Sequence, residues 1–256
     1  MKGLQGKAVL VAGGAGGIGT ATSIRLGAEG AMVAVADLNA PAAEAVAARI
    51  NEDGGRAVSM AVDIGDEEAV ASAVRAAVEA FGGLDAVHVN AADLSAETVL
   101  RDSNAVEIDL DVFDRTIRTG LRGHLLCARH AIPELAKREG GGALVFTSSA
   151  ASFVGEPERP AYAMAKSGIN ALVRHIASRW GRSGIRANAI APGLVLTETV
   201  AETLDPSFRA GALRNTRSPR LGRPEDIAAM VAFLVSDDGE WINGQVISVD
   251  GGATLR

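Results

Sequence analysis

Short apolar runs alternate with longer helical runs along the whole chain. The apolar runs are rich in β-branched residues and lack in-and-out alternation, which predicts buried strands over residues 7–12, 31–36, 56–62, 84–90, 143–147, 185–190 and 245–249. The runs between them predict helices over residues 17–29, 41–53, 67–81, 111–137, 161–180 and 224–235. Such strands, separated by helices, form a parallel sheet covered on both faces. Because no linker or low-complexity segment divides the chain, we predict one α/β domain over residues 1–256.

A glycine-rich turn joins the first predicted strand to the first predicted helix. Strand, glycine turn and helix present free backbone N–H groups and a positive helix end, which together bind a diphosphate. Two spacings fit: Gly14, Gly16 and Gly19 give G-x-G-x-x-G, while Gly13, Gly17 and Gly19 give G-x-x-x-G-x-G. Either match alone also fits an ordinary loop. Combined with the alternating pattern, it predicts a doubly wound, Rossmann-type sheet of about seven strands.

The second predicted strand ends at Asp37, eighteen residues beyond Gly19. Dinucleotide folds place an acidic residue near this position, on the adenosine ribose. A carboxylate accepts hydrogen bonds from both ribose hydroxyls and repels a 2′-phosphate, and neither the glycine turn nor Leu38 supplies a cation to neutralise that phosphate. This pattern favours NAD over NADP. The alternative is that Asp37 only caps the helix after Pro41.

The third and fourth predicted strands also end in candidate cofactor residues. Asp63, followed by Ile64, either binds the adenine amino group or simply begins the next loop. Asn90, Ala91 and Ala92 are small enough for chain and cofactor to run close together, although small residues are common at strand ends.

The strongest catalytic signal is a tyrosine and a lysine four residues apart. Tyr162, the only tyrosine of the chain, and Lys166 share one face of a helix at this spacing. A phenol with a pKa of about 10 is a poor base at neutral pH, but a neighbouring cation favours the phenolate and lowers that pKa. Ser149 follows the strand over residues 143–147, so its hydroxyl and the phenol can converge on one substrate oxygen. A lone Tyr-x-x-x-Lys pair is usually an ordinary surface pair. Here the preceding strand and the dinucleotide turn argue against that interpretation.

Composition narrows the possible partners and the compartment. The formal net charge is −6 and no basic stripe occurs, so nucleic acid and anionic membranes are poor candidate partners. Cys127 is the single cysteine, which excludes an internal disulfide and favours a reducing, cytoplasmic compartment. The four histidines show no metal-ligand grouping, so we predict no metal site. Glycines and polar residues interrupt the two uncharged runs, residues 8–24 and 140–155, so we predict no transmembrane helix in either.

These features resemble the short-chain dehydrogenase/reductase family over nearly the whole chain. The matching segments are the glycine turn, Asn90-Ala91-Ala92, Ser149, Tyr162 with Lys166, residues 192–197, residues 220–225 and residues 250–252. In the family the serine steadies the substrate oxygen, the tyrosine exchanges a proton with it, and the lysine binds the nicotinamide ribose and acidifies the tyrosine. The resemblance assigns these roles to Ser149, Tyr162 and Lys166, and it implies a homotetramer that packs helices 111–137 and 161–180 across one interface and the last strand across another.

The resemblance also completes the expected cofactor site. The segment Pro192 to Thr197 resembles the part of the family that orients the nicotinamide carboxamide. The residues that we predict to bind NAD are Gly13, Gly17, Ile18, Gly19, Asp37, Leu38, Asp63, Ile64, Asn90, Ala91, Ala92, Tyr162, Lys166, Pro192, Gly193, Val195 and Thr197.

The chain departs from the family pattern in three places. Ala12 replaces the threonine that usually opens the turn, and Val89-Asn90-Ala91-Ala92 replaces the family's Asn-Asn-Ala-Gly, which is a mild change. Gly120 replaces an asparagine that, in the family, holds a water relaying protons to the lysine. Our hypothesis is that water fills this space and keeps the relay running. His124, one helical turn on, either assists or is an ordinary helix or interface histidine.

We therefore predict an NAD-dependent enzyme that interconverts a secondary alcohol and a ketone. Loops at 93–109, 150–160 and 194–219 would carry substrate specificity, the last as a mobile lid. Two alternatives stay open: a non-catalytic NAD-binding regulatory or scaffold protein on the same fold, and an NADP-linked 3-oxoacyl-carrier-protein-type reductase.

Overall fold

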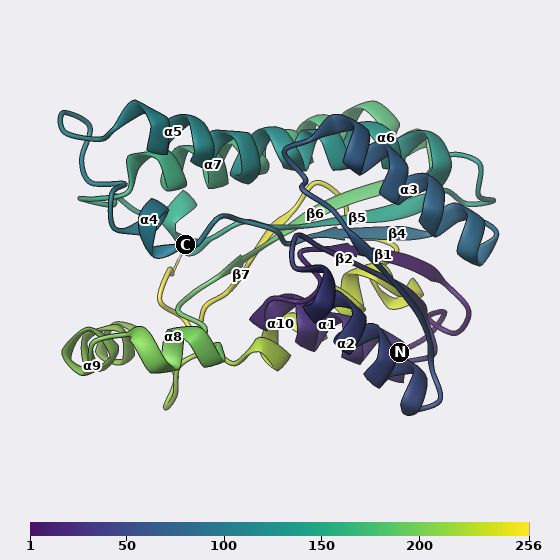
Figure 1. The fold of residues 1–256 in the computed structure, drawn as a ribbon, viewed down its shortest axis with the longest axis horizontal. Helices are drawn as coiled ribbons and strands as arrows, with labels where there is room; N and C mark the ends of the chain where they lie inside the picture. Colours follow the sequence, from purple (N-terminus) through teal and green to yellow (C-terminus); the bar gives the residue numbers. More distant parts are fainter. Residues whose placement is uncertain (256) are drawn as a thin grey trace.

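The computed structural model describes residues 1–255, apart from the side chains of residues 199 and 203, and these residues form a seven-stranded parallel sheet between two helical layers (Figure 1). The strand order is β3-β2-β1-β4-β5-β6-β7, with the chain crossing over between β3 and β4. This order and the parallel pairing confirm the doubly wound sheet. The strands are β1 (Ala8–Ala12), β2 (Met32–Asp37), β3 (Arg56–Ala61), β4 (Ala86–Val89), β5 (Gly142–Thr147), β6 (Ile185–Pro192) and β7 (Val246–Val249).

Each face of the sheet packs against its own group of helices. One face, the upper one in Figure 1, carries α3 (Glu67–Phe81), α5 (Leu110–Ile117), α6 (Gly123–Leu135) and α7 (Pro160–Trp180). The other face carries α1 (Gly17–Ala28), α2 (Ala40–Glu52) and α10 (Pro224–Val235). Alternate residues of the central strands enter one of two apolar clusters, with Val87 and Leu144 on the upper side and Ala86 and Val145 on the lower. Both faces of the sheet are therefore buried in apolar clusters, which explains why the strand sequences are continuous apolar runs.

The long helix predicted over residues 111–137 is interrupted. A π-helical turn, η1 (Arg118–Arg122), separates α5 from α6, and Gly120 lies buried inside it. A π turn inserts one extra residue into the helical repeat, so the residues on either side face different neighbours than a continuous helix would allow.

Short helices occupy loops for which the sequence predicted no regular structure. They are α4 (Ala96–Val99) in the loop after β4, and α8 (Glu198–Thr203) and α9 (Pro206–Asn215) in the segment expected to be a lid. Asp205 caps α9 by accepting from the N–H groups of Ser207 and Phe208, at 2.8 and 3.3 Å. With Pro206 next, this start signal is visible in the sequence.

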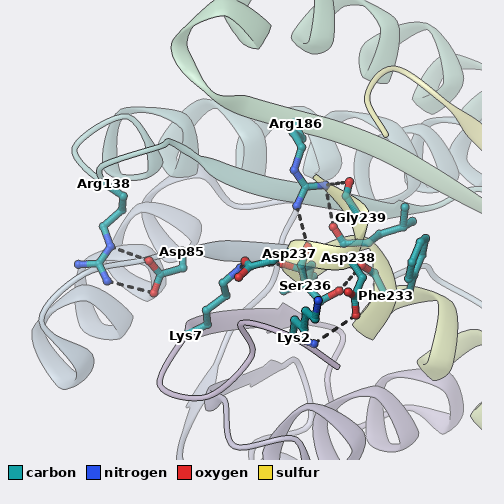
Figure 2. A network of polar contacts seen from close by, with 12 residues as sticks. Lys2, Lys7, Asp85, Arg138, Arg186, Phe233, Ser236, Asp237, Asp238 and Gly239 are labelled. Atoms are coloured by element: carbon teal, nitrogen blue, oxygen red, sulfur yellow. Dashed lines mark hydrogen bonds and ion pairs between the residues drawn. The ribbon is translucent and has the colours of Figure 1, made fainter. Parts of the chain in front are cut away.

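The amino ends of the strands are closed by a network of charged side chains (Figure 2). Arg138 makes two hydrogen bonds to Asp85, at 2.6 and 3.1 Å, and Lys7 pairs with Asp237 at 2.7 Å. The guanidinium of Arg186 donates to backbone carbonyls at the end of α10 and in the segment after it. Because ligands of open parallel sheets bind at the opposite, carboxyl ends, we assign this network a structural role.

Three further observations concern the predictions from composition. Within residues 1–255, no helix has both the length and the apolar character needed to cross a bilayer. The same residues contain no group of side chains suited to hold a metal ion. Cys127 is buried in α6, and burial raises the pKa of its thiol to about 12.

Candidate active site

The glycine turn lies between β1 and α1. At two of its glycines, Gly13 and Gly19, any side chain would disrupt the turn. Gly13 has φ +77°, and a Cβ there would lie 2.6 Å from the backbone nitrogen of Ala91. A Cβ on Gly19 would lie 1.8 Å from the carbonyl oxygen of Gly13. Both distances are far inside van der Waals contact, so the turn can fold only with glycine at these positions.

The remaining glycines distinguish the two possible spacings. A Cβ on Gly17 would lie 2.4 Å from Cγ2 of Thr197, whereas a Cβ on Gly16 would meet nothing within 4 Å. Gly14 is also confined, because a Cβ there would lie 2.8 Å from the carbonyl oxygen of Val11, so Gly16 alone argues against its spacing, and the contacts favour that of Gly13, Gly17 and Gly19. The close approach of Gly17 and Thr197 also brings the segment after β6 against the first turn of α1, where both were expected to contact the cofactor.

Asp37 lies at the end of β2 beside this turn. Its Oδ2 accepts from the N–H of Ala15 and its Oδ1 from the N–H of Asn39, both at 3.0 Å. Asn39, not Asp37, caps α2, by accepting from the N–H of Ala42 at 3.2 Å. The capping alternative for Asp37 is therefore wrong, and the carboxylate keeps further lone pairs at the mouth of the turn. Leu38 next to it is 76% exposed.

A buried polar chain connects the turn to the centre of the sheet. Asn90 donates to the carbonyl of Gly13 at 3.1 Å and accepts from the hydroxyl of Thr147 at 3.0 Å. Thr147 in turn lies 2.9 Å from Nε2 of His88, and its carbonyl accepts from Nζ of Lys166 at 2.8 Å. Asn90 therefore braces the glycine turn, and Thr147 links it to Lys166. Sequence reasoning missed Thr147, because its partners lie on other strands and helices.

The three predicted catalytic side chains converge. Tyr162 and Lys166 lie one turn apart on α7, with Nζ of Lys166 5.6 Å from the centre of the Tyr162 ring. Ser149, which follows β5, lies near enough to Tyr162 for its hydroxyl to lower the pKa of the phenol, and its Oγ accepts from the N–H of Ala151 at 3.2 Å. Hydroxyl, phenol and amine thus face one region at the carboxyl edge of the sheet.

Burial changes the proton affinities of this group. It raises the pKa of Tyr162 above its ordinary value, against the smaller lowering effects of the Ser149 hydroxyl and the Arg159 charge. It lowers the pKa of Lys166 to about 8. The expectation of a net lowering of the Tyr162 pKa is therefore wrong for the protein without cofactor, since desolvation of the phenolate outweighs the effects that favour it.

The lowered pKa of Lys166 predicts a pH dependence of stability. Between pH 8 and about 10 the unfolded chain binds a proton at this lysine that the folded chain releases, so stability rises with pH in this window. We expect the difference in unfolding free energy between wild type and Lys166→Met to move in favour of wild type by roughly 2 kcal/mol from pH 7.5 to 10. Urea unfolding of both proteins at several pH values measures it, and a difference that does not change with pH would contradict the buried, partly neutral amine.

Most other predicted cofactor residues line the same carboxyl edge. Ile18 lies in the first turn of α1, Ala92 follows β4, and residues 192–197 leave the end of β6. Val195 pairs with Gly222 in an isolated bridge, which fixes the path of this segment. Asp63, however, is engaged by the chain itself: it pairs with Arg118 at 2.8 Å and accepts from the N–H of Gly65 at 2.8 Å.

These Asp63 contacts favour the loop-start alternative. Ile64 next to it is buried in the upper apolar cluster, so only its backbone can face a cofactor.

Gly120 and His124 both face the catalytic helix. A Cβ on Gly120 would lie 3.3 Å from Cβ of Ala165, the neighbour of Lys166. His124 is fully buried and stacks on Phe146 with ring centres 6.1 Å apart. Burial, and then the charge of Lys166, hold the pKa of His124 well below its ordinary value. His124 is therefore a neutral core residue, and the interface alternative for it is wrong.

A small cavity adjoins Tyr162 on the substrate side. Its walls come from the loop after β4, from α5 and from the start of α7; they are Asp93, Leu94, Thr98, Val99, Asp102, Thr116, Arg159 and Tyr162. A larger, open groove lies between α9 and residues 219–225. All three loops predicted to carry specificity thus contribute residues to these cavities: 93–109 and 150–160 to the small one, and 194–219 to the groove.

Comparisons with known proteins agree with this geometry. The family model described as enoyl-(acyl carrier protein) reductase matches residues 13–254. A probable short-chain type dehydrogenase/reductase of Bradyrhizobium diazoefficiens is 42% identical over 97% of this chain and 87% of its own length. The 7α-hydroxysteroid dehydrogenase of Bacteroides fragilis is 31% identical, covering 100% of this chain and 97% of its own.

Solved structures show the same fold. A 7α-hydroxysteroid dehydrogenase, solved in complex with NADH and 7-oxo-glycochenodeoxycholic acid, superposes with a TM-score of 0.91 at 30% identity, covering 99% of this chain and 96% of that one. With a family model over nearly all of its length and relatives above 30% identity, the chain belongs to the short-chain dehydrogenase/reductase family and is an oxidoreductase of hydroxyl or ketone substrates that uses a nicotinamide cofactor.

Proposed function

We propose that the protein is an NAD-dependent oxidoreductase that interconverts a secondary alcohol and a ketone. The observation that carries this proposal is the convergence of Ser149, Tyr162 and Lys166 near a turn in which Gly13 and Gly19 leave no room for a side chain. Free N–H groups at the start of α1 and the carboxylate of Asp37 suit a diphosphate and an adenosine ribose. NAD, when bound, supplies or accepts the hydride.

The chain's own residues handle the proton and the oxygen. In ketone reduction the protonated phenol of Tyr162, favoured by burial, donates its proton to the substrate oxygen as negative charge develops there. The hydroxyl of Ser149 donates a hydrogen bond to the same oxygen and stabilises that charge. Lys166, held by the carbonyl of Thr147, places a cation near the phenol and favours its deprotonated form in the reverse direction.

The preference for NAD over NADP rests on Asp37 and Leu38. A 2′-phosphate at the ribose would meet the carboxylate of Asp37, and the exposed Leu38 offers it no positive charge. This argues against the alternative of an NADP-linked 3-oxoacyl-carrier-protein-type reductase.

We also propose that the single domain, with residues 194–219 as its lid, works as a cytoplasmic homotetramer. Large apolar side chains stand exposed on the helices expected at one interface: Leu110 on α5, Leu125 on α6 and Met164 on α7. Trp241, just before the last strand, is 96% exposed. Contact between subunits would cover these side chains.

The test must separate an enzyme from a non-catalytic NAD-binding protein, an alternative that the loss of an asparagine at Gly120 supports. Fluorescence titration measures NADH and NADPH binding, and a panel of secondary alcohols and ketones then measures turnover. We expect NADH to bind more tightly than NADPH and at least one panel member to turn over. Tight NADH binding without turnover of any member would favour the non-catalytic alternative.

Replacing Gly120 tests how protons reach Lys166. The Cβ of the new residue would lie 3.3 Å from Cβ of Ala165, so the first atom of the side chain needs a shift of only a few tenths of an ångström. If water already serves the relay, Gly120→Asn keeps kcat within about threefold of wild type. Steady-state kinetics of both proteins measure this, with Gly120→Ala as the control for filling the space. A large fall in Gly120→Asn but not in Gly120→Ala would contradict the hypothesis.

A further inference from the structure

The catalytic helix α7 begins without a cap of its own. Its N-cap residue, Arg159, has no side-chain acceptor and adopts φ +62°; among residues 1–255 it is the one non-glycine residue with positive φ. A left-handed conformation is unfavourable for a non-glycine residue, because its Cβ crowds the following carbonyl oxygen. Pro160 follows and has no N–H. Local sequence alone therefore does not hold this first turn in place.

The missing cap comes from a distant loop. Oδ1 of Asp102 accepts from the N–H of Ala161 at 3.1 Å, and Oδ2 accepts from the N–H of Tyr162 at 2.9 Å. The next N–H, of Ala163, donates to the carbonyl of Arg159 at 3.0 Å. Asp102 thus binds both N–H groups of the first turn that the helix cannot satisfy itself.

Backbone contacts tie the same loop to the same turn. The N–H of Arg159 donates to the carbonyls of Asp102 at 2.9 Å and Ser103 at 3.0 Å. Asp102 is only 3% exposed, and the guanidinium of Arg159 pairs with Glu156 at 2.9 Å. The carboxylate of Asp102 is therefore directed at the positive end of α7, which stabilises its charge.

We propose that Asp102 is a positioning residue: it fixes the first turn of α7, and with it Tyr162, and it couples the substrate-side loop 93–109 to that turn. Tyr162 is the third residue of α7, so a shift of the turn moves the phenol away from Ser149. Displacements of about 1 Å at a reacting group reduce rates by about 100-fold. The catalytic consequence rests on the proposed function, whereas the placement of Tyr162 does not.

Two substitutions of Asp102 and one matched control test this role. Asp102→Ala removes both acceptors, and Asp102→Asn keeps the shape with one acceptor. Asp66 caps α3 in the same manner, accepting from the N–H groups of Glu68 and Ala69 at 2.9 and 3.0 Å, so Asp66→Ala loses an equivalent cap elsewhere. We expect kcat to fall about 10- to 100-fold in Asp102→Ala and less in Asp102→Asn, with NADH affinity kept, and to stay unchanged in Asp66→Ala.

A spectroscopic readout makes the test independent of turnover. Tyr162 is the only tyrosine, so protein labelled with ¹³C in the tyrosine ring gives signals from this side chain alone. We expect these signals to shift or broaden in both Asp102 variants and to match wild type in Asp66→Ala. Folded Asp102 variants with wild-type tyrosine signals would overturn the proposal. A wild-type protein that lacks turnover, while its Asp102 variants change the signals, would instead count against the proposed function only.

Discussion

Tyr162→Phe is expected to lower kcat by about 1,000-fold, which lies within the range of general acid–base catalysis. The substitution removes one oxygen atom and keeps the aromatic ring, which lies close to the cations of Arg159 and Lys166. Without the phenolic oxygen, the substrate oxygen has no proton donor in ketone reduction. Steady-state and single-turnover rates measured with the best substrate of the panel check this result.

Two controls show that the loss concerns chemistry. NADH binding, measured by fluorescence, should stay within a few-fold of wild type, because the glycine turn and Asp37 lie outside the substitution. The unfolding free energy should change by only about 1 kcal/mol, the net contribution of one hydrogen bond. If the single-turnover rate were unaffected, the proton would come from another group and the proposed role of Tyr162 would be wrong.

Asp37→Asn combined with Leu38→Arg is expected to change the ratio of NADH to NADPH affinity by at least about 100-fold in favour of NADPH, since charge-assisted hydrogen bonds contribute about 1.5–3 kcal/mol each. The asparagine side chain would keep an acceptor for the N–H of Ala15, now satisfied at 3.0 Å, while the repulsion of a 2′-phosphate disappears. The new arginine, at a position that is 76% exposed, is free to pair with that phosphate.

Fluorescence titration with both cofactors measures this ratio, and Leu38→Ala is the matched control for loss of the leucine. We expect the control to keep the preference of wild type. If wild type itself bound NADPH as tightly as NADH, the assignment of Asp37 to the ribose would fail.

The parts of the site that were predictable depend on local geometry. Gly13 and Gly19 fill positions where positive φ or close backbone contact excludes any side chain, and such positions show in the spacing of one turn. Tyr162 and Lys166 share a helix face because their spacing matches one helical turn. The doubly wound parallel sheet followed from strand and helix alternation, which leaves few topologies open.

The parts that were missed depend on distant segments. Asp102 caps α7 from 60 residues away, and the only sequence signal was negative: Arg159 and Pro160 begin a helix without a capping side chain. Thr147 donates a hydrogen bond from its hydroxyl to Asn90 after β4, and its carbonyl accepts one from Lys166 on α7. The direction of the Tyr162 pKa shift was wrong because sequence spacing reveals the neighbouring cation but not the degree of burial.

Cys127 of α6 is buried, so the folded protein should not react with thiol reagents. These reagents attack the thiolate, which hardly forms when the pKa of the thiol is about 12. Phe208 on α9 is 59% exposed. If a cysteine replaced it, a maleimide dye would label the proposed lid alone, and Cys127 would not have to be removed first. In the parent protein the same reagent would modify only molecules that have opened, so its uptake would count the unfolded population.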